Sequence, residues 1–354
     1  MHAVDDLGDA IDVTRSFLTP FRLGLWLKLA IIVLFVSSMG LGTPTVPTGE
    51  FQMGEDIDVV EEEFDISTEE ILLGLILLGI IAVTFWLVLG FIGAILEFVF
   101  INSLVTGSVH VRRYARGNLG RGIHLFLFRV AISVVSMVLV AVPLVYLLWG
   151  GIDLDGTTIA ALAAIGLFAI VVFLLVAIIR RFTSEFVAPV MLLEERGLVS
   201  AWKRFWPVLR SNPGEYVVYL VLIWIIQFAA GIAAWFVWGI GLLVLAIPFV
   251  ILFLLLVLLG PIGIAIGIML AFLLMVVAVL WLGVIWTPIE SYFKYYALLI
   301  LGDTEPELDL IPEQRAAARA DGGSPPAAET EDTETDAWGE PEEEDWDDDP
   351  DRGW

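Results

Sequence analysis

Six polar side chains lie within or beside long apolar stretches of this sequence: Glu97, Asn102, Arg129, Gln227, Glu290 and Lys294. An ionisable group is costly in such surroundings, so each is a candidate functional residue. Glu97 is the strongest candidate because its apolar run begins at Ile71 and continues through Phe100. Two roles fit it: an ion pair with an arginine such as Arg129 near the cytoplasmic surface, or a group that handles protons or a transported solute.

The other polar candidates have simpler structural explanations. Glu290 and Lys294 are four residues apart, in the order that favours an ion pair along one helix. We expect this pair to anchor a helix at the membrane surface, and a place in a transport pathway is the alternative. Gln227 is a lone polar side chain in an apolar stretch, where an interhelical hydrogen bond accounts for it.

No arrangement of catalytic residues is recognisable. The chain has no cysteine, which excludes disulfides, thiolate metal sites and a cysteine nucleophile. Its three histidines, His2, His110 and His124, lack the spacing of metal ligands, and no HExxH motif occurs. The sequence therefore predicts a protein that is not an enzyme, with no catalytic, metal-binding or cofactor-binding residues and no nucleic-acid partner.

The elements that carry these residues are predicted to be transmembrane helices. The mean hydropathy of +0.90 is far above what a soluble core requires. A helix needs about 20 apolar residues to cross the hydrocarbon layer. Runs of that length start near Leu23, Ile71, Ile123, Thr157, Tyr216 and Ile262. We therefore expect an all-α, polytopic transmembrane helical bundle of about six spans between residues 22 and 302.

The last part of this bundle leaves one alternative open. The stretch from Tyr216 to Trp286 exceeds two ideal spans and contains Pro248 and Gly260-Pro261, with Pro288 just beyond it. These residues predict broken helices, and a seventh span is possible. Six spans are favoured because the aromatic residues around Lys294 are typical of an interfacial anchor on the basic side of the membrane.

Charge in the short links predicts the orientation in the cell membrane. Arginine and lysine are concentrated before the first span and in the links after the second and fourth spans, whereas residues 43–70 and 150–156 contain neither. The N-terminus is therefore expected in the cytoplasm. Six spans place the C-terminus there as well.

The two basic links also hold candidate lipid-facing residues. These are Arg112, Arg113, Arg116, Arg180, Arg181, Trp202, Lys203, Arg204 and Trp206. The link 180–215 repeats apolar residues at helical spacing, which predicts amphipathic cytoplasmic helices in the headgroup layer. Membrane lipids are the expected partners of these arginines, although topology alone also accounts for them.

Acidic residues are confined to the exposed segments. Residues 43–70 hold ten acids and no base, and residues 303–354 hold twenty acids and three bases. Such a balance is typical of a salt-adapted organism. The segment 303–354 is predicted to be a disordered, solvated tail, and its tryptophans allow an alternative as a docking peptide for a protein partner. Residues 1–21 are expected to form an N-terminal interfacial segment.

Three stretches resemble an uncharacterised family of haloarchaeal multi-pass membrane proteins. They run from Glu97 to Arg129, from Phe186 to Pro207, and from Tyr292 to Gln314. This resemblance implies a membrane location and a helical fold, and it implies no reaction. The Pro, Glu, Gly and Trp residues from Pro189 to Trp206 are also similar to the membrane domain attached to some glycerophosphodiester phosphodiesterases. The catalytic domain of those enzymes has no counterpart here.

Two hypotheses for function follow. The first is a non-enzymatic scaffold, regulatory or assembly component of a haloarchaeal membrane. The second is a small transporter or channel that uses Glu97 and the broken helices after Tyr216.

Overall fold

The computed structural model describes residues 2–19, 21–39, 68–149 and 156–320. Within these ranges the chain is helical and contains no strand, so the predicted all-α fold is confirmed. Most of the acidic loop 43–70 lies outside the described residues, and so does the segment 321–354. The predictions of disorder and of a docking role for that segment therefore stay predictions.

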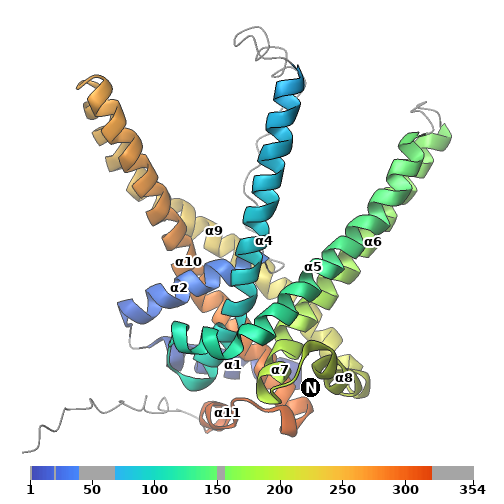
Figure 1. Ribbon diagram of the computed structural model, residues 1–354. Coiled ribbons are helices and arrows are strands. Elements are labelled where there is room, and N and C mark those ends of the chain that lie inside the picture. The colour runs from blue at the N-terminus through green and yellow to red at the C-terminus, as the bar shows by residue number, and fades with distance from the viewer. Residues whose placement is uncertain (1, 20, 40–67, 150–155, 321–354) are drawn as a thin grey trace, which may run out of the picture.

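Five long helices carry most of the exposed apolar side chains. They are α4 (Thr68–Thr106), α5 (Val111–Trp149), α6 (Gly156–Phe182), α9 (Pro213–Val257) and α10 (Pro261–Thr304). All five are long and apolar enough to cross a membrane. Figure 1 shows them diverging from a common base as three arms, with α4 alone, α5 beside α6, and α9 beside α10.

The first predicted span forms a shorter helix, α2 (Leu23–Met39), of 17 residues. This length falls just below the roughly 20 residues that a span requires. The helix lies across α4 and α10 near the base (Figure 1) and buries Leu29, Ile32 and Val33. Five of the six predicted spans therefore have a full-length helix, and α2 packs where those helices diverge.

The long apolar stretch after Tyr216 folds as two helices, which leaves no third helix there for a seventh span. α9 continues through Pro248, and α10 continues through Pro288. The chain reverses at Gly260, whose φ is 69°, and Pro261 begins α10. Glycine adopts positive φ at little cost, and proline suits the first turn of a helix. The predicted break at Gly260-Pro261 is therefore confirmed, whereas Pro248 and Pro288 do not interrupt their helices, because membrane helices tolerate an internal proline.

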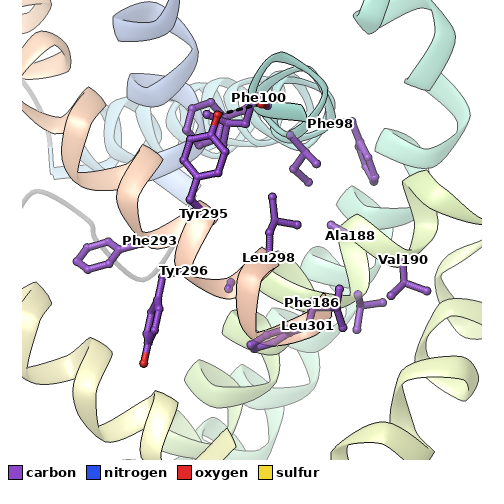
Figure 2. Packing of buried hydrophobic residues seen from close by; sticks show 14 of the residues in the cluster. Phe98, Phe100, Phe186, Ala188, Val190, Phe293, Tyr295, Tyr296, Leu298 and Leu301 are labelled. Atoms are coloured by element: carbon purple, nitrogen blue, oxygen red, sulfur yellow. Dashed lines mark hydrogen bonds between the residues drawn. The ribbon is translucent and has the colours of Figure 1, made fainter. Parts of the chain in front are cut away.

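The base is a packed protein core, whereas the arms expose their apolar side chains. Figure 2 shows Phe98, Phe186, Tyr295 and Leu298 in this core. Every residue of α10 from Phe293 to Gly302 is buried, but most large apolar side chains between residues 261 and 279 are exposed. Leaving one such side chain in water instead of burying it forgoes about 1.5–3 kcal/mol. The arms are therefore suited to an apolar surrounding.

The predicted amphipathic link 180–215 is helical, but its apolar side packs on protein. It includes the π-helical turn η1 (Thr183–Val187), α7 (Ala188–Leu193) and α8 (Leu198–Ser211). Phe205 of α8 is buried and stacks on Phe186, with 5.3 Å between ring centroids. The expectation that this side lies among lipid headgroups is wrong. An apolar helix face has the same sequence pattern whether lipid or protein covers it.

Both ends of the described chain belong to the base. α1 (His2–Leu18), which was expected as an interfacial segment, packs on α10. After α10, a 3₁₀ turn and α11 (Pro312–Arg319) fold back, and Leu308 and Ile311 are buried. The predicted start of the acidic tail at residue 303 is therefore too early, because residues 303–320 are folded.

Candidate functional site

Glu97 is almost fully buried in the base, with 1% of its surface exposed, and accepts hydrogen bonds on both carboxylate oxygens. Arg129 of α5 donates from Nη2 to Oε2 over 2.6 Å, and Lys294 of α10 donates from Nζ to Oε1 over 3.1 Å. The expected contact between Glu97 and Arg129 is therefore present. The sequence predicted that Lys294 pairs with Glu290 instead, because the spacing of four residues considers only pairs within one helix.

The π-helical turn η1 supplies further groups to the same place. The Oγ of Ser184 accepts from Arg129 Nη2 at 2.7 Å, and its carbonyl oxygen accepts from Lys294 Nζ at 2.9 Å. The Glu185 carboxylate lies 3.3 Å from Lys294 Nζ. A π-helical turn inserts a residue into a helix and re-aims its side chains, and such turns are frequent at functional sites. Sequence reasoning missed Ser184 and Glu185, although an acid between Phe182 and Phe186 was a usable signal.

A second group of polar residues lies beside the first. Arg181 of α6 donates from Nη1 to Gln227 Oε1 of α9 at 2.7 Å, and its guanidinium lies 5.8 Å from the ring centroid of Phe293. Ser37 of α2 donates to Glu290 Oε1 at 3.1 Å. Gln227 thus makes the expected interhelical hydrogen bond. The prediction that Arg181 faces lipid is wrong, because its side chain is buried between helices.

Opposite charges are balanced across this site. Three carboxylates (Glu97, Glu185 and Glu290) lie among three cations (Arg129, Arg181 and Lys294), and we call these six residues the charge network. Burying a charge is costly unless a partner of opposite sign and hydrogen bonds compensate for it. The network joins residues from α4, α5, α6, η1 and α10, so its clearest chemical capacity is to fix these elements relative to one another.

In the part of the chain that the structure describes, the charge network is not part of a metal-ligand cluster or of the apolar groove on α9. Among the described residues, no group of three or more histidine, aspartate or glutamate side chains is placed to hold a metal ion. An apolar groove on α9 is lined by Trp235, Phe236, Gly239, Ile240 and Leu243, none of which belongs to the network.

The remaining predicted site residues lie elsewhere in the base. Asn102 is partly exposed and outside the network, whereas Arg112, Arg113, Arg116, Lys203 and Trp206 are exposed. Arg180 and Trp202 are half-buried. Arg204 was expected to face lipid, but it forms ion pairs with three carboxylates, those of Glu194, Glu305 and Glu307. That expectation is wrong, since acids distant in the sequence fold back onto α8.

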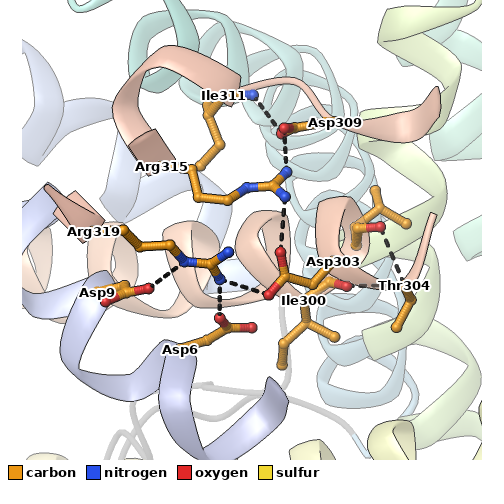
Figure 3. Close-up of polar contacts among 10 residues, drawn as sticks. Asp6, Asp9, Ile300, Asp303, Thr304, Asp309, Ile311, Arg315 and Arg319 are labelled. Carbon is orange, nitrogen blue, oxygen red and sulfur yellow. Dashed lines mark hydrogen bonds and ion pairs between the residues drawn. The ribbon is translucent and has the colours of Figure 1, made fainter. Parts of the chain in front are cut away.

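A second polar cluster joins the two ends of the described chain (Figure 3). Arg319 of α11 donates to Asp6 and Asp9 of α1 over 2.9 Å each, and to Asp303 of α10 over 2.6 Å. Arg315 pairs with Asp303 and Asp309. We call Arg319 and its three aspartate partners the terminal clasp. Burial and the neighbouring Asp303 raise the pKa of Asp6 to about 7, and the carboxylates raise the pKa of Arg319.

Residues 1–311 match a protein family described as a family of unknown function (DUF7544). The chain belongs to the DUF7544 family. The matched region contains the whole charge network and ends just before α11. No curated protein and no solved structure matches the chain. Membership of DUF7544 confirms the prediction of an uncharacterised family. The haloarchaeal lineage and the likeness to phosphodiesterase membrane domains stay predictions.

Proposed function

We propose that this protein is a non-enzymatic integral membrane scaffold, with a regulatory or assembly role, in which a fixed base holds three arms apart. The observation that carries this proposal is the charge network. Both oxygens of Glu97 are bound by protein cations, and its side chain has almost no exposed surface left for a solute. A closed, neutral network suits a fixed joint better than a transport pathway.

The surfaces that such a scaffold offers are the arms. α4 exposes apolar side chains on all sides between residues 72 and 88, with Leu73, Ile81 and Phe85 each more than half exposed. Membrane lipids and the helices of other membrane proteins are the chemically suitable partners for these faces. The base, in turn, provides a protein surface at one side of the membrane.

The proposed orientation places the base in the cytoplasm. Exposed bases such as Arg113, Lys203 and Arg210 lie on the base, whereas the sequence segments that precede α4 and connect α5 to α6, residues 43–67 and 150–155, contain no lysine or arginine. The excess of bases at the cytoplasmic side supports this placement. Both ends of the described chain then lie in the cytoplasm of a multi-pass protein of the cell membrane, which requires the chain between α1 and the far end of α4 to cross the membrane once in addition to the five long helices. The 42 acidic residues against 18 bases support a salt-rich habitat.

A small transporter is the rival function, and one observation favours it. A π-helical turn lies next to buried ionisable groups here; such turns are frequent at functional sites, and ionisable residues within membrane segments often mark ion pathways. Purified protein in lipid vesicles separates the two functions. A scaffold gives the same ion and proton leak for wild-type protein, for Glu97→Gln and for protein-free vesicles.

The opposite outcome is equally clear. A protein-dependent flux that Glu97→Gln removes would contradict the scaffold. A variant in the exposed pair, Glu307→Gln, is the matched control, because it changes one carboxylate of an ion pair outside the charge network.

A further inference from the structure

Three exposed arginines gather at the start of α5. Arg112, Arg113 and Arg116 fall within its first two turns, and no acidic residue accompanies them in the first turn. Within the described ranges none of the three takes part in an ion pair, whereas Arg121 further along the helix pairs with Glu195. Cations at a helix N-terminus oppose the helix dipole, which favours negative charge there. The α5 arginine cluster is therefore a site that an anionic group would stabilise.

The end of the described chain lies close to this cluster. Gln314 of α11 donates from Nε2 to the carbonyl oxygens of Leu104 and Val105 at the end of α4, over 3.1 Å each. The next residue, Thr106, contacts the hydroxyl of Tyr114 at 3.0 Å, and Tyr114 directly follows Arg113. Figure 1 shows α11 at the lower edge of the base. Gln314 therefore lies near the arginines, and the described chain ends six helical residues later at Ala320, about 9 Å further along α11.

The segment that follows has the complementary charge. Residues 321–354 contain fifteen acids and one base, Arg352. The first acidic run begins at Glu329, and eight extended residues span about 27 Å, so the run can reach the start of α5. A tethered segment has an effective concentration in the millimolar range, which makes a set of individually weak ion pairs sufficient for binding.

Lipid headgroups are a less suitable partner for these arginines. The axis of α5 from Trp149 to Arg113 is about 54 Å long at 1.5 Å per residue. A bilayer with its headgroups is about 40–45 Å thick. Because the arms diverge, α5 is tilted and spans less than this length in depth, which places Arg113 at or beyond the inner edge of the headgroups, where the acidic segment can reach it. We infer that the acidic segment 321–354 binds the α5 arginine cluster of its own chain.

The absence of native cysteine allows a direct test on the full-length protein. Cysteines replace Thr333 in the acidic segment and the exposed Leu119 on α5, both carry spin labels, and the distance between them is measured in lipid nanodiscs. We expect a short, narrow population at low salt. Arg112→Gln, Arg113→Gln and Arg116→Gln together should lower the ratio of docked to free segment about tenfold.

Controls separate this contact from other occupants of the cluster. The double variant Lys203→Gln and Arg210→Gln removes two exposed bases on α8 and should leave the distance between the spin labels unchanged. Replacing the acids at 331, 332, 334 and 336 by their amides should abolish the population with the short distance. A distance distribution that the arginine substitutions do not alter overturns the inference. The inference is also overturned if the full chain shows no short distance and the arginine cluster binds the same amount of anionic lipid in the full chain as in a chain ending at residue 320.

Discussion

Lys294 reaches Glu97 across 197 residues of sequence, with 3.1 Å between Nζ and Oε1. The contact joins α10 to α4 inside the base, where both side chains are nearly inaccessible to water. Because Arg129 binds the other oxygen of the same carboxylate, one acid holds two cations from two different helices. This sharing makes Glu97 the residue on which the charge network depends most.

Replacing Glu97 by glutamine should destabilise the protein by about 3–5 kcal/mol, because it removes the buried carboxylate that pairs with Arg129 and leaves Lys294 with Glu185 alone. Equilibrium unfolding in mixed detergent micelles measures this difference. Glu307→Gln removes a carboxylate from an exposed ion pair and should cost about 0–1 kcal/mol. Equal losses for the two variants would show that the buried charge network contributes no more to the free energy of unfolding than an exposed ion pair does.

Lys294→Met and Glu97→Gln should show non-additive effects when combined. The double variant removes both members of one buried pair, so its loss should be smaller than the sum of the single losses by about 1–3 kcal/mol. The same unfolding measurement on all four proteins gives this coupling energy. A sum that is simply additive would place the two side chains in independent environments.

The terminal clasp should weaken as the pH rises. Asp6 faces Asp303 and Tyr296 of α10, Arg319 of α11 and Asp9 on its own helix. Its pKa is about 7 in the folded protein, against 3.8 for a free aspartate. The folded state therefore holds this proton more tightly, and the resulting stability is full below pH 3.8 and is lost as the pH rises through about 7.

Hydrogen exchange in α1 and α11 measures this effect once the intrinsic pH dependence of exchange is subtracted. Protection in both helices should be higher at about pH 5.5 than at about pH 8. Asp6→Asn cannot ionise and should remove the difference. Equal protection at both pH values in the wild-type protein would mean that Asp6 does not change its protonation between them, which contradicts the prediction.

Gly283→Ala should separate α2 from α10. A Cβ at this position would lie 2.7 Å from the carbonyl oxygen of Ala30 and 2.8 Å from Leu34 Cγ, so one helix must shift, at a cost of about 1–3 kcal/mol. Gly79→Ala in α4 meets no atom within 4 Å and serves as the control, since alanine favours a helix over glycine. Thermal unfolding of the two variants in detergent should shift in opposite directions.

The sequence predicted the long helices well because each of them is marked by a continuous apolar run in its own stretch of sequence. Apolar runs starting at Ile71 and Ile123 correspond to α4 and α5, and Glu97 with Arg129 was nominated because each interrupts such a run. The errors share a different cause. Arg181 and the apolar side of α8 were assigned to lipid, yet Gln227 and Phe186 cover them. Which apolar or polar neighbour covers a helix face depends on tertiary packing, and hydropathy has the same value for both environments.

The long sequence separation within the charge network sets an order for biosynthesis. Glu97 and Arg129 leave the ribosome well before Lys294, which lies near the end of the last long helix. Until that helix is made, Glu185 lacks its lysine partner and the carboxylate of Glu97 holds one cation instead of two. A nascent or prematurely terminated chain without α10 lacks both Glu290 and Lys294, so the two acids and two bases that remain still balance, but the hydrogen bonds that attach α10 to Glu97 and to η1 are missing. The base is therefore locked only when the last long helix is complete.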